Sequence, residues 1–222
     1  MNKNKPTLFI ALWFVILCLG ARCLVWAQAH RHVQKMPYKI RYRERGYWQM
    51  PRRVIESIGA GEGMTVADVA CGDGYFTLLI AERVGASGQV YAEDIDGDAL
   101  KVLEERRDEA GVRNVTIIHG QADDPMLPIN KIDLALIVNS IHLIRDLKTF
   151  LDHIRRSLTP GGRLVIIQWA AEKMDSEAPE WDPENRKLFT LSTSMKRIHE
   201  ARFEVVDFIN FLPVQYIFIC EP

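Results

Sequence analysis

The sequence predicts an α/β fold with three layers, in which helices cover both faces of a mostly parallel sheet. Short apolar runs alternate with segments of helical spacing over residues 64–220, an order typical of parallel sheets. The first run, Val66–Ala70, is followed by a turn with two glycines and then by a helical pattern. The last two runs, Phe203–Phe211 and Val214–Cys220, predict a closing strand pair that adds an antiparallel strand.

Residues 1–29 predict a targeting or anchoring segment outside the folded domain. The apolar run Leu8–Ala21 has the length of a signal-peptide core and is short for a membrane span. The small-x-small pattern Ala27-Gln28-Ala29 favours cleavage and export, whereas the positive charge after it favours an uncleaved anchor with a cytoplasmic domain. Both alternatives place the protein at the cell envelope, and residues 8–29 contact the membrane if they are not cleaved.

Charge divides the rest of the chain into two parts. Residues 30–53 carry eight Lys/Arg and one acid, whereas from Val54 onward 17 Lys/Arg face 28 Asp/Glu. An acidic main domain argues against a nucleic-acid partner. The basic, aromatic-rich stretch is expected to be a linker or a lid, or a juxtamembrane segment facing anionic lipid. We therefore divide the chain into segment 1–29, linker or lid 30–53 and domain 54–222, with no expectation for the oligomeric state.

The stretch Val66–Phe76 predicts a strand, a tight turn and the start of a helix. Gly72 and Gly74 supply the backbone freedom for the turn, and N–H groups at the helix start face the crevice beyond the strand. This geometry suits a nucleotide-like ligand, although a turn without a ligand is the simpler alternative. A dinucleotide fingerprint needs a third small residue where Thr77 stands, so a nicotinamide-dependent oxidoreductase is the weaker hypothesis.

The same stretch resembles the first motif of class I S-adenosylmethionine (SAM)-dependent methyltransferases, roughly D/E-x-G-x-G-x-G. Asp68, Gly72 and Gly74 match it, and Ala70 replaces the first glycine, as in a form that the family itself uses. Val-Tyr-Ala-Glu-Asp-Ile-Asp is similar to the second motif, and Leu-Thr-Pro-Gly-Gly-Arg-Leu-Val-Ile-Ile to a structural stretch recurrent in the family. The resemblance implies a Rossmann-like fold with a mostly parallel seven-stranded sheet and an antiparallel last strand. It also implies SAM as the cofactor.

The resemblance further implies the residues of the cofactor site, which are Asp68, Ala70, Gly72, Gly74, Tyr75, Asp94, Ile95, Asp123 and Asn139. Asp94 is expected to hold the ribose, because a carboxylate accepts two hydrogen bonds from a vicinal diol, while Asp96 is expected to cap the next helix. Adenine is expected to meet Asp123 or Asp124, because Gln121 stands where the family usually has its acid. Asn139 is expected to contact the methionine part of SAM.

His142 follows the fourth apolar run, Ile132–Val138, where methyl donor and acceptor meet in this fold. It is a candidate general base for an acceptor hydroxyl or amine, and the alternative is that it only packs against the cofactor. The sequence therefore predicts an enzyme that transfers a methyl group from SAM to a small-molecule acceptor by in-line displacement, without a metal. A catalytically silent, membrane-tethered binding module of the same fold is the alternative. Acceptor specificity is expected from residues 30–53 and 170–201.

Overall fold

The computed structural model describes residues 45–173 and 189–222. The predicted segment 1–29 and most of the predicted linker or lid lie outside the described residues. Within the described residues, no helix is both long and apolar enough to cross a membrane. The first half of the domain contains α3 (Arg45–Gln49), α4 (Pro51–Ser57), β1 (Thr65–Val69), α5 (Thr77–Val84), β2 (Gln89–Asp94), α6 (Gly97–Glu109) and β3 (Val115–His119). The second half contains β4 (Ile132–Val138), α7 (Leu147–Ser157), β5 (Leu158–Trp169), the 3-10 helix η1 (Ala171–Lys173), α8 (Leu191–Glu200), β6 (Glu204–Ile209) and β7 (Gln215–Glu221).

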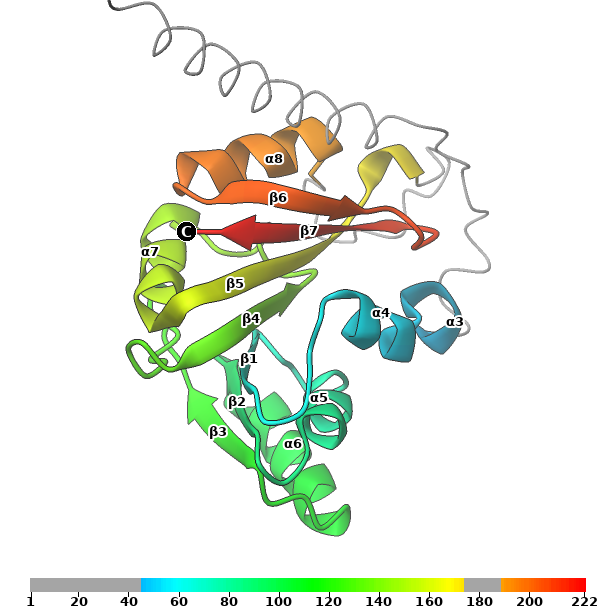
Figure 1. The fold of residues 1–222 in the computed structure, drawn as a ribbon, viewed down its shortest axis with the longest axis vertical. Helices are drawn as coiled ribbons and strands as arrows, with labels where there is room; N and C mark the ends of the chain where they lie inside the picture. Colours follow the sequence, from blue (N-terminus) through cyan, green and yellow to red (C-terminus); the bar gives the residue numbers. More distant parts are fainter. Residues whose placement is uncertain (1–44, 174–188) are drawn as a thin grey trace, which may run out of the picture. The chain divides into compact units, whose positions relative to one another are not determined.

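The strands form one seven-stranded sheet in the order β3-β2-β1-β4-β5-β7-β6 (Figure 1). The first five strands of this order are parallel to one another. β7 lies between β5 and β6 and is antiparallel to both. The predicted three-layer fold and its antiparallel last strand are confirmed. Strand order reverses at β1, which lies between β2 and β4, and open sheets of this kind bind ligands at such a switch point.

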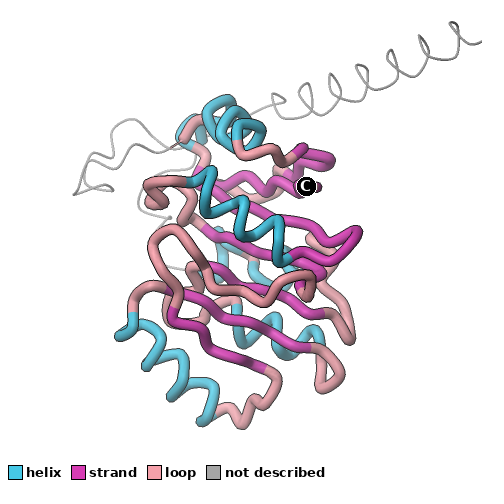
Figure 2. Tube along the Cα trace, turned by 90° about the vertical axis from the view of Figure 1, so that its left-hand side faces the viewer, coloured by secondary structure: helices cyan, strands magenta, loops and turns pink. Residues whose placement is uncertain are grey.

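Helices cover both faces of the sheet (Figure 2). One core cluster joins apolar side chains of α4, α5 and α6 to the sheet, including Val54, Ile80 and Leu103. α7 packs against β5, and α8 packs against β6. The buried runs of β4 and β5 have no alternation of polar and apolar residues, as expected for strands covered on both faces.

β5 starts at Leu158 and runs through Thr159–Gly162. Leu158 pairs with Ile132 and Arg163 pairs with Leu134, so a bulge takes up the extra residues of β5. A Cβ added to Gly162 would lie 2.7 Å from the Ile132 carbonyl oxygen, so glycine is required where the bulge meets β4.

α8 begins at Leu191 and is capped by the residue before it. Residues 184–188 lie outside the described residues, and Phe189 and Thr190 are not helical. The Thr190 hydroxyl accepts a hydrogen bond from the Thr193 amide, which makes Thr190 the N-cap. A capping threonine adopts extended dihedral angles, and the helix therefore starts at Leu191.

Candidate active site

The glycine-rich turn after β1 has a backbone that few residues adopt. Ala70, Gly72 and Gly74 have φ values of 54°, 58° and 79°. A Cβ added to Gly74 would lie 2.2 Å from Leu103 Cδ1, so α6 packs directly against this glycine. A Cβ added to Gly72 would meet no atom within 4 Å, which leaves open space next to the turn. The turn is thus packed on one side and open to a ligand on the other.

Asp68 lies beneath the turn and is only 2% exposed. The Thr77 hydroxyl donates a hydrogen bond of 2.6 Å to Asp68 Oδ2. Because Thr77 is the first residue of α5, this bond joins the end of β1 to the start of the helix. Asp68 therefore supports the shape of the turn from below.

Asp94 stands at the carboxyl end of β2 and faces the same turn. Its Oδ2 accepts a hydrogen bond of 2.7 Å from the Gly72 amide, and its Oδ1 accepts one of 2.9 Å from the Asp96 amide. A carboxylate has about four lone-pair positions, so both oxygens keep capacity for ribose hydroxyls. Ile95, the next residue, is 58% exposed and offers an apolar surface beside Asp94. Asp96 caps α6 by accepting bonds from the amides of Asp98 and Ala99, as the sequence predicts.

The two acids in the loop after β3 differ in their surroundings. Asp124 Oδ1 accepts a hydrogen bond of 2.8 Å from the Met126 amide, and its Oδ2 lies 3.2 Å from His153 Nδ1 of α7. Asp123 is exposed, as is Gln121. Asp124 thus holds the loop to α7, and the exposed Asp123 stays the predicted candidate for a contact with adenine.

Asn139 follows β4 and has a left-handed backbone, with a φ of 55°. Its amide donates a hydrogen bond of 2.7 Å to the Ile167 carbonyl. Its Oδ1 accepts a bond of 2.9 Å from Gln215 Nε2 at the start of β7. Gln215 is not among the residues predicted from the sequence, although a polar residue that begins an otherwise apolar strand is an available signal.

His142 lies in the loop after β4 and contacts β5. Its Nδ1 is 3.0 Å from Gln168 Nε2. A side-chain amide nitrogen only donates, so Nδ1 accepts here and the neutral ring carries its hydrogen on Nε2. If the Gln168 amide is rotated by half a turn, its buried Oε1 accepts a hydrogen bond from His142 Nδ1–H. His142 Nε2 then carries no hydrogen and is the basic nitrogen of the ring. The predicted base function of His142 therefore requires this second arrangement.

An aromatic pair lies next to Asn139 and Gln215. The rings of Trp48 in α3 and Trp169 at the end of β5 are 4.8 Å apart, and Trp169 pairs with Gln215 across the sheet. Trp48 Nε1 and Gln215 Oε1, a donor and an acceptor, are buried without hydrogen-bond partners in the described part of the chain. The Phe189 ring is 6.4 Å from the His142 ring. Aromatic and polar groups thus gather at the carboxyl end of β5.

Lys173 fixes the turn between β6 and β7. It is 4% exposed, and its Nζ donates hydrogen bonds to Asn210 Oδ1 and to the carbonyls of Leu212 and Gln215. Burial lowers the pKa of Lys173 to about 8, and the charge of Glu172 opposes this. The ammonium group therefore holds the start of β7, where Gln215 stands.

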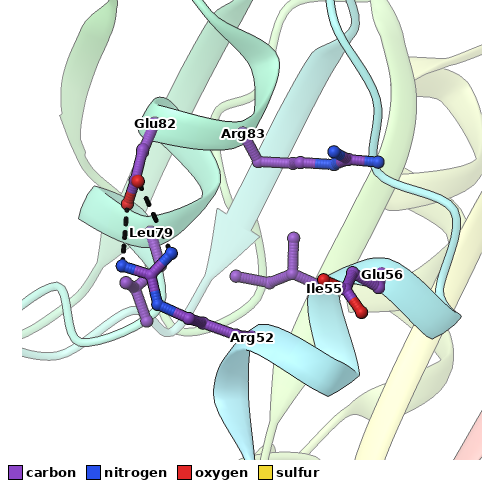
Figure 3. A pocket seen from close by; sticks show the side chains of 6 residues that line it. All are labelled: Arg52, Ile55, Glu56, Leu79, Glu82 and Arg83. Carbon is purple, nitrogen blue, oxygen red and sulfur yellow. Dashed lines mark hydrogen bonds and ion pairs between the residues drawn. The ribbon is translucent and has the colours of Figure 1, made fainter.

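A shallow pocket of about 240 Å³ lies between α4 and α5 (Figure 3). Its lining contains the ion pair of Arg52 and Glu82, with an N–O distance of 3.3 Å, and Arg83, whose Nε donates to the Ala60 carbonyl. None of the predicted site residues lines this pocket. It is therefore not the predicted cofactor site.

The residues at the carboxyl edge of the sheet fit SAM. The open space beside Gly72, the carboxylate of Asp94 and the exposed Ile95 lie at the switch point of the sheet. SAM carries a positive charge, and the acids at this edge favour a cation. Among the described residues, no cluster of three His, Cys, Asp or Glu side chains could hold a metal.

Comparison with known proteins decides the family. The model of the methyltransferase domain family matches residues 60–213. The chain belongs to this family. By family the chain contains a methyltransferase domain.

Several relatives share this domain. The demethylmenaquinone methyltransferase of Anoxybacillus flavithermus is 31% identical over 144 residues, which are 65% of this chain and 60% of that protein. The demethylmenaquinone methyltransferase of Staphylococcus aureus is 29% identical, and the match covers 82% of this chain and 86% of that protein. The chain spans about 60% of the length of the curated relatives that it matches first. A SAM-dependent methyltransferase from Aquifex aeolicus has the same fold, with a TM-score of 0.72 and 24% sequence identity. The superposition covers 82% of this chain and 94% of that protein.

Proposed function

We propose that this methyltransferase transfers the methyl group of SAM to a small, lipophilic ring compound that carries oxygen substituents. The observation that supports this acceptor class is the group formed by Trp48, Trp169 and Gln215. The two indole rings provide an apolar wall, and the unpartnered Trp48 Nε1 and Gln215 Oε1 need an acceptor and a donor. A ring with oxygen substituents satisfies both. The names of the demethylmenaquinone methyltransferases support the same class.

Catalysis then depends on position more than on reactive side chains. The bound cofactor supplies a methyl group that its sulfonium has already activated. We propose that Asp94 holds the ribose, that Asp123 meets adenine, and that Asn139 orients the methionine part. Tyr75 and Ile95 border the same space. The chain has to align donor and acceptor and to exclude water, which accounts for much of the rate in reactions of this type.

His142 is the candidate for the proton that the acceptor loses. When Gln168 Nε2 donates to His142 Nδ1, the neutral imidazole carries its hydrogen on its own Nε2 and donates through it. After rotation of the Gln168 amide, the hydrogen is on His142 Nδ1, and His142 Nε2 can accept a proton. We propose that an acceptor hydroxyl that donates to His142 Nε2 selects the second arrangement, because Nε2 can accept this bond only when it carries no hydrogen.

The test is transfer of a radiolabelled methyl group from SAM by the full chain. The acceptors are a prenylated hydroquinone, the same ring without its tail, a polar amine and RNA. We expect transfer to the two ring compounds, with the prenylated one preferred. Transfer only to the amine or RNA would refute the acceptor class, and SAM binding without any transfer would favour the silent module. His142→Gln should lower turnover while SAM affinity persists, and exposed His199→Gln is the control.

Membrane association and the location of the domain rest on residues 1–29 alone. We propose that this segment keeps the protein at the cell envelope, close to a lipophilic acceptor. Flotation of the full chain and of a chain starting at His30 with lipid vesicles tests this. Equal flotation of both chains would contradict the proposal.

A further inference from the structure

Glu93 is a buried carboxyl group directly beneath the proposed cofactor turn. The residue is 1% exposed and precedes Asp94 in β2. Its Oε2 accepts a hydrogen bond of 3.3 Å from the Ala70 amide, and its carbonyl accepts one of 2.9 Å from the Cys71 amide. A Cβ added to Gly120 would lie 1.8 Å from Oε1, so the loop after β3 covers the carboxyl group from the other side. Glu93 therefore contacts two of the segments that bound the site.

The charged groups that act on Glu93 are acids. Asp94 of β2, Asp68 of β1 and Asp124 of the loop after β3 all disfavour its negative charge. Two histidines of neighbouring elements have other partners: His119 Nε2 of β3 lies 3.0 Å from the Ile95 carbonyl oxygen, and His153 of α7 pairs with Asp124 at 3.2 Å. In the described part of the chain, no Lys, Arg or His forms an ion pair with Glu93. Among the described residues, a negative charge on Glu93 thus has no ion-pair partner to balance it.

Glu93 changes its charge close to neutral pH. Burial raises the pKa of Glu93 to about 8, the hydrogen bond from Ala70 opposes this rise, and the neighbouring carboxylates add to it. The Cys71 thiol lies in the same turn. Its pKa is raised strongly, by burial first and then by the charges of Asp68, Asp94 and Glu93, so the thiol stays neutral.

SAM and the product S-adenosylhomocysteine (SAH) differ in one charge. The sulfur of SAM is a sulfonium cation, and the sulfur of SAH is a neutral thioether. We propose that Glu93 is a specificity-determining residue of the cofactor site, whose ionised form favours SAM over SAH. Binding and ionisation are reciprocal, so SAM lowers the pKa of Glu93 more than SAH does. Loss of the sulfonium charge on methyl transfer then weakens retention of the product. This inference rests on the cofactor and does not depend on the acceptor.

The test is calorimetric titration of SAM and of SAH into the full chain from about pH 6.5 to about pH 9. We expect the preference for SAM over SAH to rise on the order of tenfold with pH in the wild type. In Glu93→Gln, which keeps an oxygen for the Ala70 amide but has no charge, this rise should be lost. The amino groups of both ligands also titrate in this range. The contribution of Glu93 is therefore measured as the difference between the wild type and Glu93→Gln in how far the preference for SAM rises with pH. Exposed Glu105→Gln on α6 is the matched control and should behave as the wild type.

The same rise with pH in Glu93→Gln and in the wild type would overturn the proposal. Failure of both ligands to bind the wild type would overturn it together with the cofactor site. If the variant does not fold, carbon-13 NMR of the wild type decides, by following the glutamate carboxyl that titrates near pH 8. A larger fall of its pKa with SAM than with SAH supports the proposal, and equal falls contradict it. Acceptor turnover is not measured, so a wrong acceptor class leaves these results unchanged.

Discussion

The Gly72 amide and Asp94 Oδ2 lie 2.7 Å apart, and this hydrogen bond ties the glycine-rich turn to the end of β2. The bond is charge-assisted, which makes it shorter and stronger than one between neutral groups. It fixes the turn in the shape that leaves space beside Gly72. Asp94 thus has two proposed functions, one in shaping the turn and one in holding the ribose.

Asp94→Ala should weaken SAM binding by roughly 10- to 100-fold, because it removes the ribose acceptor and loosens the turn. Calorimetric titration of SAM measures this loss. Asp98→Ala is the control, because Asp98 is exposed at the start of α6 and pairs with Lys101 in solvent. An Asp94→Ala chain that is folded and binds SAM as the wild type does would remove Asp94 from the cofactor site.

Gly74→Ala should destabilise the domain more than Gly161→Ala. Both glycines have a φ near 80°, so each substitution incurs about 1 kcal/mol of backbone strain. Only at position 74 does the new Cβ collide with Leu103, which adds roughly 1–3 kcal/mol. Urea unfolding measures both variants. Equal losses would mean that α6 moves away without cost.

Ala70→Gly should leave stability unchanged or raise it by up to about 1 kcal/mol. Alanine at a φ of 54° is strained, and glycine relieves that strain at some cost in backbone entropy. Ala67→Gly is the matched control in β1, where the backbone is extended and glycine should cost about 1 kcal/mol. A marked loss of stability in Ala70→Gly would show that the alanine methyl group contributes packing.

These positions also show how far the sequence predicts the molecule. The bounds of β4 agree residue for residue with the apolar run that the sequence analysis names, because this run lies between turn signals. The function of Asp96 as a cap was predictable, because a cap depends on the next few residues only. Gln215, Gln168 and Trp48 were missed, because each acquires its contacts through pairing of strands and helices distant in sequence. The sequence also did not show which of Asp123 and Asp124 has a structural partner, since that partner, His153, lies on α7 and pairs with Asp124.

Lys173→Met should lower the free energy of unfolding by roughly 2–4 kcal/mol, because the carbonyls of Leu212 and Gln215 lose their donor. Exposed Lys148→Met on α7 is the control. The folded-state pKa of about 8 lies below the ordinary 10.5, so the unfolded chain binds more protons between these values. Wild-type stability should therefore gain a contribution from Lys173 as pH rises from 8 to 10.5. If the difference between wild type and Lys173→Met stays constant across this range, Lys173 does not titrate as its burial implies.

Glu93 should give the opposite dependence on pH in the protein without ligand. Its folded-state pKa of about 8 exceeds the ordinary 4.5, so between these values the folded chain holds a proton that the unfolded chain has lost. The contribution of Glu93 to stability is complete below pH 4.5 and is lost as pH rises through 8. Glu93→Gln stays neutral, so its stability relative to the wild type should increase over this window, by at most about 1.4 kcal/mol for each pH unit. Urea unfolding of both chains at several pH values measures the difference. A difference that does not change with pH would mean that Glu93 is ionised in the folded protein throughout, with a cation beside it.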